Sequence, residues 1–373
     1  MYIILLLLVS VVTIYSAEDK PTFPKCFDCN IYDLEEGRIK NNNIFAITKK
    51  RQQTIQNYFS MRTTSKEINK YLNPVHVQQE EFSLFNGKKI ISSAISIPHA
   101  YDIEFTEKPP LPIFRNQDRC KIMQLGNDEI LAFVADGHSG DFVSHHLYDN
   151  FSQYFINCSR DLTDPKDILQ KAFNKIDDEV IEKMNENNLP QGGSTMSVCY
   201  ITPKAVYIAH VGDSRIMCIG ENNEILYTTD DHTINSDDSS INAKLQELNQ
   251  KNSAYYTVDG RLWMDISDDI SKRIQSTRSL EDAISKIGIQ STRSIGDPLF
   301  KKIVSCSPVI HAISRNNVAR VVMASDGFWE HYDKKNITVD LFKNSAAELV
   351  KPLILWNSDD LTVVVIDIPA LSL

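Results

Sequence analysis

Short apolar runs rich in Val and Ile, each bounded by Gly, Asn or Asp, recur from Lys88 toward the end of this chain. Such runs are typical of short strands in antiparallel sheets. The predicted strands are residues 90–97, 120–125, 130–135, 194–201, 206–211, 216–219, 318–324 and 361–368. Two predicted helices, 140–155 and 165–185, lie between them, and the second has apolar residues at helical spacing. Long helices beside antiparallel strands predict an α+β sandwich.

The composition is that of an ordinary globular protein. The chain has 373 residues, of which 42% are hydrophobic and 24% charged, enough for one large core or two small ones. Its net charge of −10 argues against a nucleic-acid partner held through phosphate contacts. The surplus of carboxylates leaves some of them available to cations.

The first 17 residues form an apolar run that is too short and too close to the terminus for a comfortable membrane span. We predict that residues 1–17 are a signal peptide and that the protein is secreted or in the secretory pathway. The run lacks a basic start, and Tyr15 is a poor residue for a cut after Ala17, so an uncleaved anchor is the alternative. Secretion would make three glycosylation sequons usable, at Asn150, Asn157 and Asn336.

Residues 18–87 are polar and rich in Asn, Lys and Gln, and we predict that they are an N-terminal extension. The chain has seven cysteines, two of which, Cys26 and Cys29, form a Cys-x-x-Cys that predicts a local disulfide in an oxidising compartment. Cys199 and Cys218 lie in apolar strand-like runs and are predicted to be core thiols. The odd total leaves at least one thiol free or intermolecular.

Three acidic positions lie at predicted strand ends. Asp136-Gly137 follows one strand, Asp326-Gly327 follows another, and Asp359-Asp360 precedes the last. Mg²⁺ and Mn²⁺ prefer oxygen ligands and retained waters, so carboxylates from separate strands could form a cation site. A single Asp-Gly is usually only a turn, and the interpretation depends on the combination.

Seven short motifs follow one another in a fixed order. They are Asp136-Gly137-His138, Gly193-Ser194-Thr195, Val211-Gly212-Asp213-Ser214-Arg215, Asp231-His232, Thr292-Arg293-Ser294-Ile295-Gly296-Asp297, Ala324-Ser325-Asp326-Gly327-Phe328-Trp329 and Asp359-Asp360-Leu361-Thr362-Val363. In this order and spacing, residues 88–368 resemble the metal-dependent type 2C protein phosphatases, the PPM family. The resemblance implies a β-sandwich of two antiparallel sheets flanked by helix pairs, a four-layer αββα arrangement. It implies a phosphatase domain over residues 88–368.

The resemblance also implies an activity, the hydrolysis of phosphoserine and phosphothreonine in protein substrates by a water activated at a pair of Mg²⁺ or Mn²⁺ ions. By position, Asp136 and the Gly137 carbonyl match ligands of that pair, with Asp136 bridging both ions. Asp326 and Asp359 match the remaining direct ligands of the first ion. His138 matches the general acid, and a neighbouring carboxylate would keep it protonated. Asp213 matches a residue near a third, weaker metal position.

The chain departs from the family pattern before Asp136. Gln117 stands where a metal-supporting glutamate is common, whereas the acid that follows it, Asp118, is retained. The spacing of the family's phosphate-binding arginine falls on Ile113, so that role is lost or belongs to Arg115 or Arg119, of which we favour Arg115. Asp360 replaces an asparagine, which leaves open which of the two adjacent acids coordinates; the match of the residues after them favours Asp359.

The remaining motif residues are predicted to support the structure. Gly193-Ser194-Thr195 and Asp231-His232 are predicted to pack and cap near the site. Arg215 and Arg293 are each expected to hold a buried carboxylate rather than substrate phosphate. Phe328 and Trp329 are predicted to be core residues.

Two alternatives to the active protein phosphatase remain. The same fold could serve as a catalytically inactive binding or scaffold protein, a hypothesis that depends only on Ile113 and Gln117. It could also act on another phosphoester, with the same metal chemistry and a different pocket. We expect a monomer whose partner is a phosphorylated protein, with no stable membrane insertion if residues 1–17 are cleaved.

Overall fold

The computed structural model describes residues 76–83, 89–97, 116–126, 128–187, 189, 191–234, 238–249, 255–258, 260–265, 286–332, 340–350, 352–353 and 359–369. The predictions for residues 1–17, Cys26, Cys29, Arg115 and Asn336 lie outside this part of the chain. Within it, no helix is long and apolar enough to cross a membrane.

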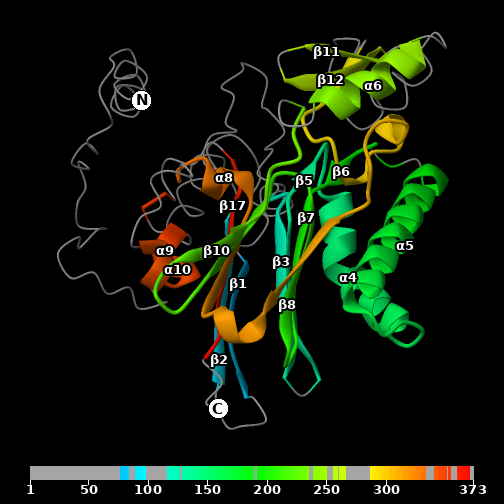
Figure 1. The fold of residues 1–373 in the computed structure, drawn as a ribbon. Coiled ribbons are helices and arrows are strands. Elements are labelled where there is room, and N and C mark those ends of the chain that lie inside the picture. Colours follow the sequence, from blue (N-terminus) through cyan, green and yellow to red (C-terminus); the bar gives the residue numbers. More distant parts are fainter. Residues whose placement is uncertain are drawn as a thin grey trace, which may run out of the picture. The chain divides into compact units, whose positions relative to one another are not determined.

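Two antiparallel sheets form the centre of the fold (Figure 1). Sheet A has the order β1 (His76–Ser83), β2 (Lys89–Ile97), β17 (Leu361–Asp367), β16 (Arg320–Ala324), β9 (Arg215–Ile219) and β10 (Ile225–Thr228). Sheet B has the order β15 (Val309–Ser314), β8 (Ala205–Val211), β7 (Met196–Ile201), β4 (Glu129–Ala135) and β3 (Arg119–Gly126). The predicted α+β sandwich is confirmed.

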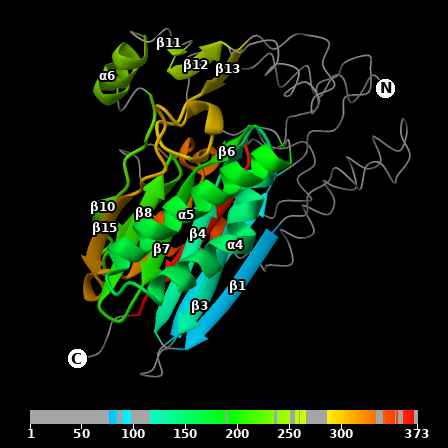
Figure 2. The ribbon, with the colours of Figure 1, turned by 90° about the vertical axis from the view of Figure 1, so that its right-hand side faces the viewer.

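The alternation of side chains along the strands produces two apolar layers. One face of each sheet contributes to a common core, in which Ile122, Ile130 and Val134 of sheet B join Val321 and Val364 of sheet A. The other face of sheet B packs against two long helices, α4 (Phe142–Ser159) and α5 (Pro165–Glu186), as Figure 2 shows. The central strands of sheet B, β4, β7 and β8, are therefore buried on both faces, which explains their nearly continuous apolar sequence.

The outer face of sheet A carries shorter helices. These are α8 (Asp326–Trp329), α9 (Asp340–Lys343) and α10 (Ala346–Val350). Helix α10 contacts β2 and β17. Helices were predicted on the outer face of each sheet. In the described part of the chain, those on sheet B are long and those on sheet A are short.

Two small sheets complete the fold. One joins β5 (Gly137–His138), β6 (Gly193–Ser194) and β14 (Ile295–Gly296). The other consists of β11 (Tyr255–Val258), β12 (Arg261–Asp265) and β13 (Lys286–Ile289), which share a core with α6 (Asp238–Asn249). Short 3-10 helices, η2 (Pro298–Phe300) and η3 (Arg315–Asn317), flank β15.

Several strands were not predicted, among them β10, β11, β12, β13 and β15, and β1 changes the expected organisation most. It pairs with β2 along its whole length, from His76 opposite Ser96 to Ser83 opposite Lys89. Its Phe82 side chain is buried in the core between the sheets. Residues 76–83 thus belong to sheet A, although they lie in the segment predicted to be an extension. Their polar sequence, HVQQEEFS, suits an edge strand, but it lacks an apolar pattern that would predict one. Only the pairing with β2 in the structure identifies it as a strand.

Candidate active site

Three of the sequence motifs meet in the two-residue strands of the small sheet. Gly137 pairs with Ser194, His138 with Gly193, and Ile295 with Ser194. Residues about 60 and 160 positions apart in the sequence are thereby brought side by side next to the end of β4. The predicted supporting role of Gly193-Ser194-Thr195 follows directly, because the Ser194 hydroxyl and the Thr195 N–H both donate to the Asp136 carbonyl, at 2.9 and 2.8 Å.

The small sheet also gives His138 a carboxylate partner. Its Nε2 lies 2.9 Å from each carboxylate oxygen of Asp297, and the Ser294 hydroxyl donates to the same carboxylate. Gly193 makes room for this contact, since a Cβ there would overlap Asp297 and lie 2.7 Å from His138 Nε2. The sequence predicted that His138 has an acidic neighbour without identifying it. The available signal was the end of the Thr292–Asp297 motif, which had no assigned role.

Asp297 controls the charge of the imidazole. Burial lowers the pKa of His138, but the charge of Asp297 and its hydrogen bond outweigh this, so the pKa is raised above its ordinary value. The protonated form of the ring is consequently favoured, which is the form expected of the predicted general acid.

The predicted acids lie at strand ends of both large sheets. Asp136 and Asp118 flank strands of sheet B, at the end of β4 and the start of β3. Asp326 follows β16 and Asp359 precedes β17 in sheet A, while Asp213 lies between β8 and β9 and thus between the two sheets.

These acids share one electrostatic environment. The pKa of Asp136 is raised well above its ordinary value by burial and then by the other carboxylates, namely those of Asp118, Asp326, Asp359 and Asp213. Burial, Asp213 and Asp359 raise the pKa of Asp326 to about 7. The pKa of Asp213 is raised to about 6, chiefly by burial. Uncompensated negative charge is therefore concentrated here, which a divalent cation would relieve.

Two carboxylate oxygens of this group show whether the site suits a cation. Asp118 Oδ2 and Asp326 Oδ1 are buried and have no hydrogen-bond partner. A buried carboxylate oxygen without a partner is costly, so each calls for a cation or water. Among the described residues, no cluster of three or more His, Cys, Asp or Glu side chains could hold a metal ion by itself. The buried oxygens of Asp118 and Asp326 nevertheless suit Mg²⁺, because this ion commonly uses one or two carboxylates and completes its octahedron with waters.

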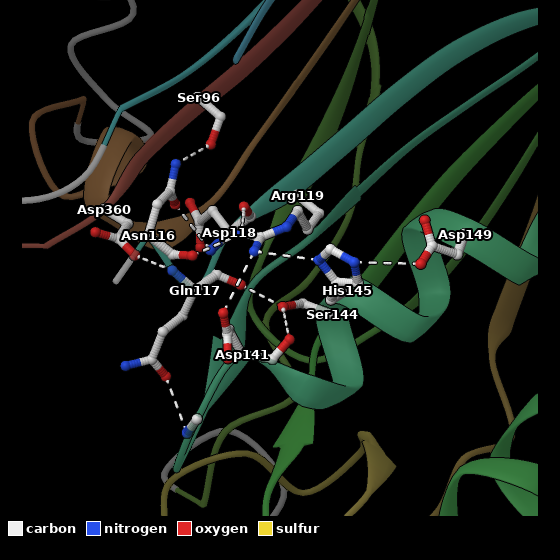
Figure 3. Close-up of polar contacts among 11 residues, drawn as sticks. Ser96, Asn116, Gln117, Asp118, Arg119, Asp141, Ser144, His145, Asp149 and Asp360 are labelled. Carbon is white, nitrogen blue, oxygen red and sulfur yellow. Dashed lines mark hydrogen bonds and ion pairs between the residues drawn. The ribbon is translucent and has the colours of Figure 1, made fainter. Parts of the chain in front are cut away.

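Gln117, the predicted metal-supporting residue, makes direct hydrogen bonds to two neighbouring segments. Its side-chain carbonyl accepts a hydrogen bond from the Gly140 N–H, 3.2 Å away, and its backbone N–H donates to Asp360 Oδ2 at 2.6 Å (Figure 3). Asp360 is buried, whereas Asp359 is exposed at the start of β17. The contact to Gln117 occupies one Asp360 oxygen, in keeping with the preference for Asp359 as ligand.

Arg119 is engaged with the backbone. Its Nη1 donates to the carbonyls of Asn116 and Asp118, at 2.6 and 2.7 Å, and Nη2 lies 3.5 Å from Asp141 Oδ2 (Figure 3). A guanidinium used in this way supports the loop before β3. The preference for Arg115 as the phosphate-binding residue stays a prediction, because that residue is outside the described part.

The other supporting predictions have mixed outcomes. Arg215 holds Asp231 through two contacts, Nε to Oδ1 at 2.5 Å and Nη2 to Oδ2 at 2.6 Å. The pairing is the expected one, but the carboxylate is half-buried rather than buried. Arg293 instead donates to the Ser307 carbonyl at 2.7 Å. Phe328 and Trp329 are buried, and the Trp329 indole donates to the Ala324 carbonyl at 3.0 Å. Cys199 and Cys218 are buried free thiols, as predicted.

Comparison with known proteins gives a consistent result. The family model described as Protein phosphatase 2C matches residues 115–240 and 265–351. The chain is 26% identical over 253 residues to "Probable protein phosphatase 2C 28" of Arabidopsis thaliana, covering 65% of each chain. It is 35% identical over 91 residues to "Probable protein phosphatase 2C 17" of the same plant, covering 24% of this chain and 32% of that one. The matches thus span less than two thirds of these relatives' length.

Solved structures share the fold at low sequence identity. The serine-threonine phosphatase 2C from Toxoplasma gondii superposes with a TM-score of 0.57 at 16% identity, covering 80% of this chain and all of that one. A C. elegans sex determining protein gives a TM-score of 0.53 at 16% identity, covering 80% of this chain and 66% of that one. With the family model matched over more than half of the chain, this protein belongs to the protein phosphatase 2C family.

Proposed function

We propose that this protein is an Mg²⁺- or Mn²⁺-dependent phosphatase that hydrolyses phosphoserine and phosphothreonine in protein substrates. The observation that carries the proposal is the pair of buried, unpartnered oxygens on Asp118 and Asp326 within a group of mutually repelling acids. Family membership supplies the reaction class. The alternative of an inactive scaffold has no specific observation in its favour.

Asp136, the Gly137 carbonyl, Asp326 and Asp359 would hold the two ions, and Asp213 would contribute to a third, weaker position. Asp118 would orient waters around the second ion, since it keeps an unsatisfied oxygen. Gln117 would support the second ion as well, and it holds Asp360 and Gly140 through hydrogen bonds. When bound, the ions supply an activated water and neutralise charge on the phosphoryl oxygens.

His138 would protonate the leaving oxygen. A serine or threonine alkoxide leaves slowly unless it receives a proton, and the Asp297 partner keeps the imidazole charged and oriented for that transfer. Arg115 would bind the substrate phosphate, and its replacement by alanine should raise KM more than it lowers kcat.

The direct test is manganese-dependent hydrolysis of a phosphothreonine peptide by the full chain. Asp136→Asn and Asp326→Asn should each reduce kcat/KM by about 100-fold or more, because each removes a charge that holds the ions. Asp178→Asn, at an exposed position of α5, is the matched control and should leave the rate unchanged. Turnover without metal, or equal rates in all variants, would contradict the mechanism. Tight Mn²⁺ binding without turnover would favour the inactive scaffold.

We also propose that the protein enters the secretory pathway, on the strength of the apolar residues 1–17. If so, the two described sequons should differ. Asn157 is exposed, whereas the Asn150 amide donates to the His146 carbonyl at 3.0 Å on α4. Mass spectrometry of protein secreted from eukaryotic cells should find Met1 absent and glycan at Asn157 in preference to Asn150. An intact Met1 contradicts cleavage.

A further inference from the structure

The two aspartate-glycine corners of the site, Asp136-Gly137 and Asp326-Gly327, come from different sheets. β4 belongs to sheet B and β16 to sheet A, and the two sheets share no strand pairing. Their common core consists of apolar contacts, which are non-directional. Carboxylates that must hold shared ions need a more exact spacing than such contacts provide, so a polar link between the corners is expected.

Each corner glycine has a backbone oxygen pressed against it. A Cβ on Gly137 would lie 2.8 Å from the Gln117 carbonyl oxygen and 2.7 Å from Ser144 Oγ. A Cβ on Gly327 would overlap the Asp360 carbonyl oxygen and lie 3.1 Å from Asp359 Cβ. Both positions therefore require glycine because of close neighbours, Gln117 at one corner and Asp360 at the other.

These two neighbours are joined to each other. The Gln117 backbone N–H donates to Asp360 Oδ2 at 2.6 Å, across 243 positions of sequence (Figure 3). The Gln117 carbonyl in turn accepts from the Gly137 N–H at 3.2 Å and from the Ser144 hydroxyl.

Asp360 is anchored equally well on its own side. Its carbonyl accepts from the Ser325 hydroxyl at 3.3 Å, next to Asp326, and its N–H donates to Asp359 Oδ1 at 2.7 Å. A continuous line of hydrogen bonds thus runs from the Gly137 corner, through Gln117 and Asp360, to Ser325 and Asp359.

We propose that Gln117 and Asp360 form a strap that fixes the spacing between the Asp136-Gly137 and Asp326-Gly327 corners. Both are positioning residues, which act on the ions through the ligands they hold. This inference rests on the proposed function, because the spacing matters only if the corners share ions. The acceptor oxygen of Asp360 is the essential feature, and an asparagine can supply it.

The test measures Mn²⁺ affinity by calorimetry, without substrate, on the full chain. Asp360→Ala should weaken binding about 10- to 100-fold, the usual cost of losing a partner that orients a metal ligand. Asp360→Asn should stay within about 3-fold of the wild type, because it keeps the acceptor. Asp178→Ala is the matched control for acid removal and should bind as the wild type does. Thermal unfolding in EDTA monitors the fold of each variant.

The outcomes separate this inference from the proposed function. If the wild type binds no Mn²⁺, the proposed function fails. If the wild type binds, Asp136→Asn does not, and Asp360→Ala binds as tightly as the wild type, only the strap is overturned. Equal losses in Asp360→Ala and Asp360→Asn would also overturn it, because charge rather than the hydrogen bond would then be responsible. If the alanine variant does not fold, Asp360→Ser replaces it; the shorter side chain cannot span the contact, and wild-type affinity in that variant contradicts the strap.

Discussion

At the scale of single residues, the site depends on close polar contacts for which neighbouring glycines leave room. His138 meets Asp297 because Gly193 has no side chain, and Gln117 meets the Asp136 corner because Gly137 has none. A substitution at such a pair should change the chemistry more than the fold, since each pair lies beside the core rather than within it.

Asp297→Asn tests the general acid. The amide keeps one acceptor for His138 but loses the charge that raises the pKa of the ring, so less of the imidazole is protonated at neutral pH. We expect kcat for a phosphothreonine peptide to fall about 10-fold or more, and kcat for p-nitrophenyl phosphate to change little, because nitrophenolate leaves without a proton. Equal losses on the two substrates would mean that Asp297 does not act through proton donation.

At the scale of elements, side chains fix helices to the sheets. Arg320 of β16 is buried, and its Nη1 donates to the carbonyls of Leu341 and Asn344 at the end of α9, at 3.2 and 3.0 Å. Its Nε donates to Asp367 Oδ1 at 2.6 Å. One guanidinium therefore satisfies carbonyls at a helix C-terminus and ties that helix to sheet A.

Arg320→Met should lower the free energy of unfolding by about 1.5–3 kcal/mol, because the helix carbonyls lose a charged donor. Asp367→Asn is the comparison, since its side chain is 43% exposed and the loss should stay below about 1 kcal/mol. Urea unfolding measures both values. A larger loss in Asp367→Asn would show that the ion pair, not the helix end, is the important contact.

Helices α4 and α5 carry a pH-dependent contact at His146. The ring is 7% exposed; burial, followed by the charge of Lys183, lowers its pKa despite Glu179 Oε1 lying 3.5 Å from Nε2. A histidine with a depressed folded pKa contributes full stability above its unfolded pKa of about 6.5 and loses it as the pH falls below that value.

As the pH falls below about 6.5, the free energy of unfolding of the wild type should therefore fall relative to that of His146→Gln. The acids with raised pKa values, Asp136, Asp213 and Asp326, act in the opposite direction and remain in both proteins. Burial also lowers the pKa of His210 and His331, and both remain in the variant, so the difference between the two proteins isolates His146. Urea midpoints at several pH values provide the measurement. Parallel curves for wild type and variant would contradict this assignment.

At the scale of the whole described fold, β1 closes one edge of sheet A. A chain that starts at Lys88, where the sequence suggested a boundary, lacks the eight residues paired with β2 and the buried Phe82. Loss of Phe82 alone should cost about 3 kcal/mol, and the uncovered β2 edge should promote aggregation. A chain that starts at residue 70 keeps β1 and should be more stable in urea than the chain that starts at Lys88. Equal stability of both shortened chains would show that β1 is dispensable.

Most of the architecture was accessible from the sequence. Strands β3, β4, β7 and β8 of sheet B, the long helices α4 and α5 and the acids at strand ends all follow from local patterns, because regularly spaced burial is visible in the order of apolar and polar residues. Strand β15 of the same sheet was not predicted. The polar edge strand β1 shows no such pattern. The contacts of Gln117 were also inaccessible, because its backbone N–H binds Asp360 and its side chain binds Gly140, which lie in two separate segments.

The sequence by itself identified Asp136, His138 and Asp326 as the residues that we propose to carry the chemistry, because they stand in short motifs whose order and spacing can be read along the chain. Only the tertiary structure decided how they are held. Asp297 and Asp360 became partners of His138 and Gln117 through packing between segments more than 150 residues apart. The local sequence determines the secondary structure and the buried face of each segment. A hydrogen bond between distant segments forms only once the sheets have assembled around a common core.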